Sequence, residues 1–132
     1  MVEGTKVVKT RKAPQAIGPY SQGVIAQGEF LFVSGQIPLD PESGNLVEGG
    51  IVEQTQRVLK NVKPILQAHA LTLEHVVKTT VFMTDLGEFT DMNKVYGEFF
   101  KEGYPARSTI QVAALPKGAR VEIEAICVVQ HD

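Results

Sequence analysis

Several features that mark specialised classes of protein are missing from this chain of 132 residues. Its single cysteine, Cys127, cannot form an internal disulfide, and a lone thiol fits a reducing compartment. No apolar run approaches membrane-spanning length, and the first residues do not form a charged-then-apolar signal sequence. Lysine plus arginine (13) nearly balance aspartate plus glutamate (15), so no net field attracts nucleic acid or anionic membrane. We therefore expect a cytoplasmic protein that binds neither.

Patterns typical of metal and cofactor sites are also lacking. The histidines His69, His75 and His131 are scattered, and none has a cysteine, histidine or carboxylate partner at metal-ligand spacing. Cys127 alternates with valine and isoleucine, which favours a buried, inert thiol over a nucleophile. No Ser-His-Asp grouping, phosphate loop or dinucleotide fingerprint is evident. The sequence thus predicts neither a metal ion nor an organic cofactor.

What is present predicts one folded domain over residues 1–132. This length supplies one hydrophobic core but not two ordinary domains. A composition of 43% hydrophobic and 21% charged residues is typical of a folded protein, and no repeat or linker divides the chain.

The order of predicted elements indicates the fold class. Strands are expected near residues 7–8, 23–26, 30–33, 76–83, 109–112 and 120–129, with a hairpin turn at 27–29 joining the second and third. Apolar residues at helical spacing predict helices from Ile51 to about Ala70 and from Phe89 to Phe100. Pro64 should kink or shorten the first helix because it lacks an N–H. We predict an α+β fold: a mixed sheet with two helices packed on one face.

The end of the last predicted strand is apolar on both faces. Cys127 and Val129 point one way while Ile126 and Val128 point the other, and residues 30–33 and 81–83 are similarly two-faced. Two helices can cover only one face of such a sheet. We therefore expect self-association through the second face.

Three polar residues are candidates for chemistry. Arg107 follows a proline-fixed turn, where a rigid guanidinium could bind a carboxylate in a bidentate manner; a surface ion pair is equally compatible. Glu124 shares a face with Ile126 and Val128, so we expect partial burial, which suits either proton transfer near neutral pH or a structural salt bridge. Asn93, on the apolar stripe of the second helix, either caps a buried backbone group or faces a polar pocket. These features indicate a small anionic substrate and acid–base chemistry, without identifying a reaction.

The same residues lie in motifs that resemble the RidA/YjgF (reactive intermediate deaminase) family over nearly the whole chain. Several long motifs in matching order are far more specific than one short motif. In chain order they are AIGPYSQ at 16–22, VSGQIP at 33–38, VKTTV at 77–81, PARS at 105–108, VAALPKG at 112–118 and VEIEA at 121–125.

The resemblance implies a chorismate-mutase-like fold assembled as a homotrimer with clefts between subunits and no cofactor. It implies hydrolysis of 2-iminopropanoate, 2-iminobutanoate and similar enamine/imine intermediates to 2-oxo acids and ammonia. Arg107 matches the family arginine that holds the substrate carboxylate, and Glu124 matches the glutamate thought to position water and move protons. The remaining matched positions, expected to line the cleft and in part to come from the neighbouring subunit, are Tyr20, Ser34, Gly35 and Asn93.

Two positions depart from the family pattern. Thr109 stands where several relatives carry a cysteine near the substrate, so thiol chemistry cannot be essential here, and thiol-linked regulation would be lost. Pro64 stands where a helix-favouring residue is expected, away from the matched site.

Other functions remain open on the sequence. A non-enzymatic sensor of 2-oxo acids would use the same Arg107, and turnover would separate it from a deaminase. An RNA-cleaving translation inhibitor, a role ascribed to relatives, is disfavoured by the near-neutral charge and by the lack of a basic stripe or paired histidines. A holdase chaperone would use the apolar faces of a loosened trimer, and activity in a stable trimer would make that role secondary.

Overall fold

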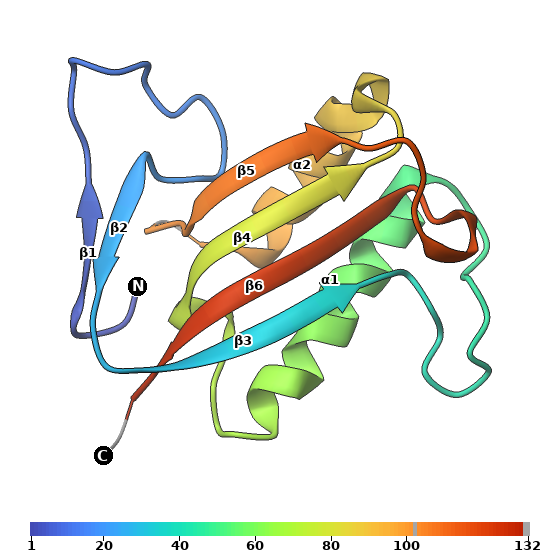
Figure 1. Cartoon of the computed structure of the whole chain (residues 1–132), viewed down its shortest axis with the longest axis horizontal. Helices are drawn as coiled ribbons and strands as arrows, with labels where there is room; N and C mark the ends of the chain where they lie inside the picture. Colours follow the sequence, from blue (N-terminus) through green and yellow to red (C-terminus); the bar gives the residue numbers. More distant parts are fainter. Residues whose placement is uncertain (102, 131–132) are drawn as a thin grey trace.

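A four-stranded sheet forms the centre of the computed structural model, which describes residues 1–101 and 103–130 (Figure 1). Its strands, in spatial order, are β3 (Glu29–Gln36), β6 (Val121–Val129), β4 (Val76–Met83) and β5 (Ala106–Gln111). Strand β6 is antiparallel to both β3 and β4, whereas β4 and β5 are parallel. This mixed sheet confirms the predicted α+β class.

Both long helices, α1 (Ile51–Gln67) and α2 (Phe89–Phe99), lie on the same face of this sheet, as expected (Figure 1). Their apolar stripes face the sheet because the buried positions recur every three or four residues. Helix α1 continues through Pro64 and ends at Gln67, short of the expected end near Ala70. The core contains Val58, Leu59, Val62 and Leu66 of α1, Met92, Val95 and Tyr96 of α2, and Val81, Ile123 and Cys127 of the sheet.

The predicted hairpin between residues 23–26 and 30–33 is wrong. Strand β2 (Gly23–Ala26) instead pairs with β1 (Thr5–Val8) in a separate two-stranded antiparallel sheet, while β3 pairs with β6. The chain turns away at Gly28, whose φ of 126° is accessible mainly to glycine. This change of direction lets β3 join the larger sheet, where Val33 is buried opposite Ala125 of β6.

Three short 3₁₀ helices complete the described elements: η1 (Leu73–His75), η2 (Leu86–Glu88) and η3 (Pro116–Gly118). Among the residues that the structure describes, no helix is long and apolar enough to cross a membrane. Within the same residues, no group of three histidine, cysteine or acidic side chains is arranged to hold a metal ion. His131 lies outside the described residues.

Much of the second face of the sheet is uncovered in the single chain, although Val128 at the end of β6 is 3% exposed. Side chains of β6 alternate, so Ile123 and Cys127 are buried under the helices while Glu124 and Ile126 point to the outer face. Large apolar side chains stand exposed on the same outer face: Phe32 of β3 is 71% exposed and Ile110 of β5 is 45% exposed. Apolar side chains therefore lie on both faces of the sheet, as the sequence predicts. Those exposed on the outer face form an apolar surface without a partner in one chain.

Candidate active site

Arg107, the second residue of β5, has its guanidinium among three aromatic rings. Its Cζ lies 4.8 Å from the ring centroid of Tyr96, 5.0 Å from that of Tyr20 and 5.6 Å from that of Phe89. Each ring presents a negative face to a cation at this range. The three rings, together called the aromatic shell, fix the position of the half-buried side chain and exclude much of the water that would otherwise solvate it.

Among the described residues, the guanidinium donates one hydrogen bond, and its acceptor is a neutral amide oxygen. Nη1 of Arg107 donates to Oδ1 of Asn93 over 2.7 Å, which answers why α2 carries a polar residue on its apolar stripe. Within residues 1–101 and 103–130, no carboxylate forms an ion pair with Arg107. Burial lowers the pKa of Arg107 below its ordinary value, yet an arginine stays charged in any protein. The site therefore holds a positive charge that is partly desolvated and uncompensated.

Backbone contacts bring Tyr20 to Arg107 from a distant part of the chain. The Ser21 N–H donates to the carbonyl of Pro105 over 3.0 Å, and the Ser21 hydroxyl donates to the carbonyl of Tyr104. These bonds tie residues 20–21 to the start of β5, next to Arg107. Gly18 lies close by: a Cβ there would be 3.2 Å from Nδ2 of Asn93, so a larger residue would press on the amide that orients Arg107.

Tyr96 connects the residues around Arg107 to the core. These residues, here called the Arg107 cluster, are Tyr20, Thr79, Phe89, Asn93 and Tyr96. Its hydroxyl is 2.8 Å from Oγ1 of Thr79 on β4, and its ring stacks on Phe100 with centroids 4.4 Å apart. Burial raises the pKa of Tyr96 to about 12, so this phenol is neutral at physiological pH. Tyr96 therefore contributes its ring face and a fixed hydroxyl rather than a base.

Thr109 lies two residues beyond Arg107 and points to the same side of β5. Its Oγ1 is buried, and no hydrogen-bond partner is found for it in the described part of the chain. A buried hydroxyl without a partner costs free energy unless something satisfies it. The predicted lining residues Tyr20, Asn93 and Thr109 thus accompany Arg107 on one chain.

Ser34 and Gly35 lie elsewhere, at an irregularity of β3 where the pairing with β6 shifts between Val33 and Gln36. An added Cβ at Gly35 would be 2.0 Å from Oε2 of Glu122, so this position admits the Glu122 side chain only because it is glycine. Glu122 was not singled out from the sequence, and its close approach to Gly35 is visible only in the fold.

Glu124 and Arg107 point to opposite faces of the sheet. Arg107 pairs with Thr79, which pairs with Ala125 on the helix side, whereas Glu124 pairs with Thr80 on the outer side. Glu124 is exposed, so the expectation of partial burial is wrong for the single chain. Of the two apolar residues on its face, Val128 is 3% exposed and Ile126 is only partly buried, so the cover over the end of β6 does not reach Glu124. A surface beyond this chain would be needed to desolvate it.

Ser34 and Gly35 are also separated from Arg107 across the sheet. Strands β3 and β5 are the two edges, with β6 and β4 between them. Neighbouring strands lie about 4.8 Å apart, so the edges are about 14 Å apart. One chain therefore supplies two separate sets of predicted residues: Tyr20, Asn93, Arg107 and Thr109 on the β5 edge, and Ser34, Gly35 and Glu124 on β3 and the outer face.

Sequence reasoning missed three residues of the Arg107 cluster. Phe89 and Tyr96 were read as members of a core stripe on α2, which they are, and nothing in their spacing marks a role beside a cation. Thr79 was noted only as part of a family motif. Asn93, on the same helix as Phe89 and Tyr96, was the available signal, because a polar residue on that stripe requires a polar partner nearby.

Comparison with known proteins identifies the family of this chain. A family model described as Endoribonuclease L-PSP matches residues 10–129, nearly the whole chain. The chain belongs to this family. It is the RidA/YjgF family that the sequence motifs resemble.

Individual relatives carry different names. Protein DfrA of Myxococcus xanthus is 51% identical, over 93% of this chain and 95% of that protein. The human 2-iminobutanoate/2-iminopropanoate deaminase is 49% identical, over 93% of this chain and 89% of that protein. The crystal structure of E. coli TdcF with bound serine superposes with a TM-score of 0.73 at 45% identity, covering 95% of this chain and 99% of that chain.

Proposed function

We propose that this protein is a hydrolytic deaminase of 2-imino acids, acting on 2-iminopropanoate and 2-iminobutanoate without a cofactor. The observation that carries the proposal is the uncompensated, half-buried guanidinium of Arg107 within its aromatic shell. A 2-imino acid bears the carboxylate that such a cation binds. The human relative named for this activity, alike over most of both chains, supports the same substrate class.

The reaction requires little machinery. Water adds to the C=N carbon, protons move from that water to nitrogen, the C–N bond breaks, and ammonia leaves a 2-oxo acid behind. Because the imine is already electrophilic, position, charge and one proton carrier suffice. Arg107 holds the substrate carboxylate, Glu124 takes a proton from the attacking water and returns it to nitrogen, and Thr109 directs its hydroxyl to the bound substrate.

A complete site takes residues from two copies of the chain. Arg107 and Glu124 point to opposite faces of one sheet, so a substrate held by Arg107 cannot meet Glu124 of the same chain. A neighbouring copy packed on the exposed outer face would supply its own Glu124, with Ser34 and Gly35, to the Arg107 cluster. Cyclic association repeats such a contact and closes it. We propose a homotrimer with three sites of this kind.

The ligand reported for E. coli TdcF supports this substrate class. Serine carries an α-carboxylate next to a carbon bonded to nitrogen, as a 2-imino acid does. A site built for this pairing requires an unpaired cation and a small polar neighbour, and Arg107 and Thr109 provide both. The cytoplasmic location read from the sequence remains a prediction.

The test is release of 2-oxobutanoate from 2-iminobutanoate generated in situ by threonine dehydratase, with wild type beside Arg107→Ala. Removing the charge from a desolvated site should cost about 2–5 kcal/mol of substrate binding, a loss of roughly thirty- to several-thousand-fold. The mutant should keep its assembly, measured by sedimentation. A folded, assembled Arg107→Ala protein within twofold of wild type would contradict the assignment.

No acceleration by the assembled wild type would favour the 2-oxo acid sensor instead, and titration with 2-oxobutanoate would then be the next measurement. The family description names an RNA-cleaving activity, but a formal net charge of −2 gives this chain no general attraction for a polyanion. We therefore place the deaminase first.

A further inference from the structure

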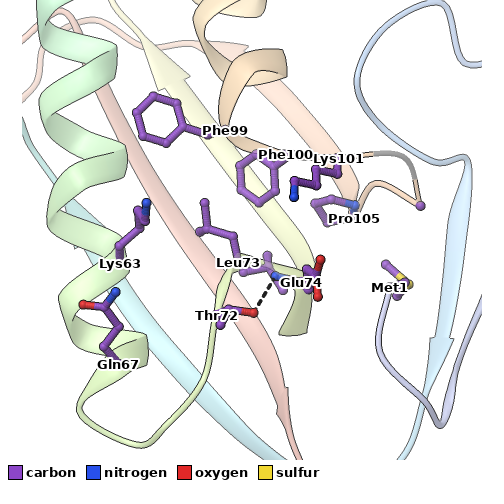
Figure 2. Close-up of a pocket in the computed structure, with 12 residues that line it drawn as sticks. Met1, Lys63, Gln67, Thr72, Leu73, Glu74, Phe99, Phe100, Lys101 and Pro105 are labelled. Carbon is purple, nitrogen blue, oxygen red and sulfur yellow. Dashed lines mark hydrogen bonds between the residues drawn. The ribbon is translucent and has the colours of Figure 1, made fainter.

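A cavity of about 450 Å³ opens on the helix side of the molecule, outside the Arg107 cluster (Figure 2). Its walls come from the second half of α1, from η1 with its flanking residues, and from a set of further residues: Met1, Phe99, Phe100, Lys101, Gly103 and Pro105. Figure 2 shows Lys63 and Gln67 on α1 across from Lys101 and Pro105, with Phe100 and Leu73 between them. Its volume falls in the range of small-molecule sites, about 300–1,000 Å³.

The floor of the cavity is apolar and firmly packed. Phe100 is 4% exposed and Val76 is 1% exposed, and Leu73 and Phe99 pack against the same core. These side chains belong to elements held by the sheet and both helices, so the floor is formed without a ligand. Such a surface suits a ring or a branched aliphatic group.

Cations dominate the rim. Lys63 and Lys101 are exposed lining residues, and neither forms an ion pair within the part of the chain that the structure describes. The one charged contact of Lys63 is with the ring of Phe99, 6.0 Å from its centroid. Glu74 is the single acidic side chain among the described lining residues, which also include Lys63, Lys101 and the amino group of Met1. The remaining polar groups, Thr72 and Gln67, can donate hydrogen bonds.

We propose that this cavity is a second binding site, for a small amphipathic monoanion with an apolar body and one carboxylate. The apolar body would lie on Phe100 and Leu73, and the carboxylate would meet the ammonium groups of Lys63 and Lys101. This site is distinct from that of the imino acid and does not depend on the deaminase activity. A 2-imino acid of three or four carbons has too little apolar surface to fill it.

The two sites share a wall. Phe100, part of the cavity floor, stacks on Tyr96 with ring centroids 4.4 Å apart, and the same Tyr96 ring centroid lies 4.8 Å from Cζ of Arg107. Pro105 lines the cavity two residues before Arg107. Binding must therefore be assigned to one site or the other by a variant that removes only one of them.

The test is a titration of the ¹⁵N-labelled assembled protein with 3-phenylpropanoate, followed by NMR, beside the neutral 3-phenylpropan-1-ol. We expect saturable shifts at the amides of Thr72, Leu73 and Gly103, with the alcohol binding more weakly. Lys63→Gln and Lys101→Gln should each weaken binding by roughly two- to five-fold, as expected for exposed charges. Lys94→Gln, an exposed lysine on α2 outside the lining, should bind as wild type does.

Arg107→Ala separates the two sites. Binding that persists in this variant, with the same amides shifting, supports the second site whether or not the protein proves to be a deaminase. Shifts that disappear with Arg107→Ala would overturn it, because the acid would then occupy the Arg107 cluster. Equal affinity for the acid and the alcohol, or no saturable shift at Thr72, Leu73 and Gly103, would overturn it as well.

Discussion

At the scale of single residues, the informative feature of Arg107 is that it has no ion-pair partner among the described residues. Its neighbours orient it through three ring faces and one amide oxygen, but no carboxylate of the described chain neutralises it. A structural arginine at this depth would ordinarily be ion-paired, because an unpaired buried charge is costly. The free energy lost by desolvating this charge in the free protein can be regained when an anionic ligand binds to it.

Asn93→Asp tests this reading with an almost isosteric change. A carboxylate at position 93 would lie 2.7 Å from Nη1 of Arg107 and form the ion pair that the natural protein lacks. We expect KM for 2-iminobutanoate to rise about tenfold or more, because substrate must compete with an internal carboxylate. The melting temperature should be unchanged or higher. A KM within twofold of wild type would mean that the free charge is not what binds substrate.

Residue roles were only partly accessible from the sequence. The turn before Arg107 and the odd placement of Asn93 marked both as candidates, yet only the fold shows that they touch. Glu124 was expected to be partly buried because Ile126 and Val128 share its face. That inference was wrong for one chain, because the cover that buries Val128 at the end of the strand does not extend to Glu124.

At the scale of elements, the sequence pattern predicts a strand or helix correctly where the packing of the fold favours the same structure. Residues 76–83 were predicted as a strand and form β4 with those bounds, since Val and Thr dominate it and its inward-facing side chains are buried. The turn at 27–29 was located correctly but its partners were not. The partner of β3 is determined by where its buried side chains can pack. That partner is β6, which lies far along the sequence.

Pro64 is unusual for a helix residue, because it lies within α1 and removes one backbone hydrogen bond there. Pro64→Ala should restore that bond at an exposed position without disturbing the core. We expect the free energy of unfolding to rise by about 1–3 kcal/mol, less than a mid-helix proline would cost, because the position is in the last turn. Urea unfolding measures the change, and Lys60→Ala, one turn earlier and also exposed, should stay within about 0.5 kcal/mol of wild type. A destabilised Pro64→Ala would mean that the ring itself stabilises the end of α1.

At the scale of the whole molecule, the outer face of the sheet is the surface through which we propose that copies of the chain associate. Phe32 is 71% exposed there and pairs with Ile126, whose side chain also points away from the helices. An apolar surface of this kind on a small protein marks an interface. The two sets of predicted site residues lie apart in one chain and become neighbours only if that face is covered by another copy.

Phe32→Glu should separate the copies while leaving each chain folded. A carboxylate on the outer face would be desolvated on association, which disfavours the assembly by several kcal/mol. We expect sedimentation as a single chain, a native far-ultraviolet circular dichroism spectrum and no deaminase activity. Val52→Glu, which puts the same charge on exposed α1, serves as the matched control and should remain assembled and active. A fully active, single-chain Phe32→Glu protein would exclude a shared site.

The most direct test of the two-copy site is complementation between two inactive variants. Arg107→Ala and Glu124→Gln are co-expressed with different affinity tags, and mixed assemblies are isolated by tandem purification. In a cyclic trimer of mixed composition, one of the three directional contacts joins an intact Arg107 to an intact Glu124, so about a third of wild-type activity should return. If both residues acted within one chain, no site in a mixed assembly would hold both. Activity no higher than that of either variant alone would then contradict the account.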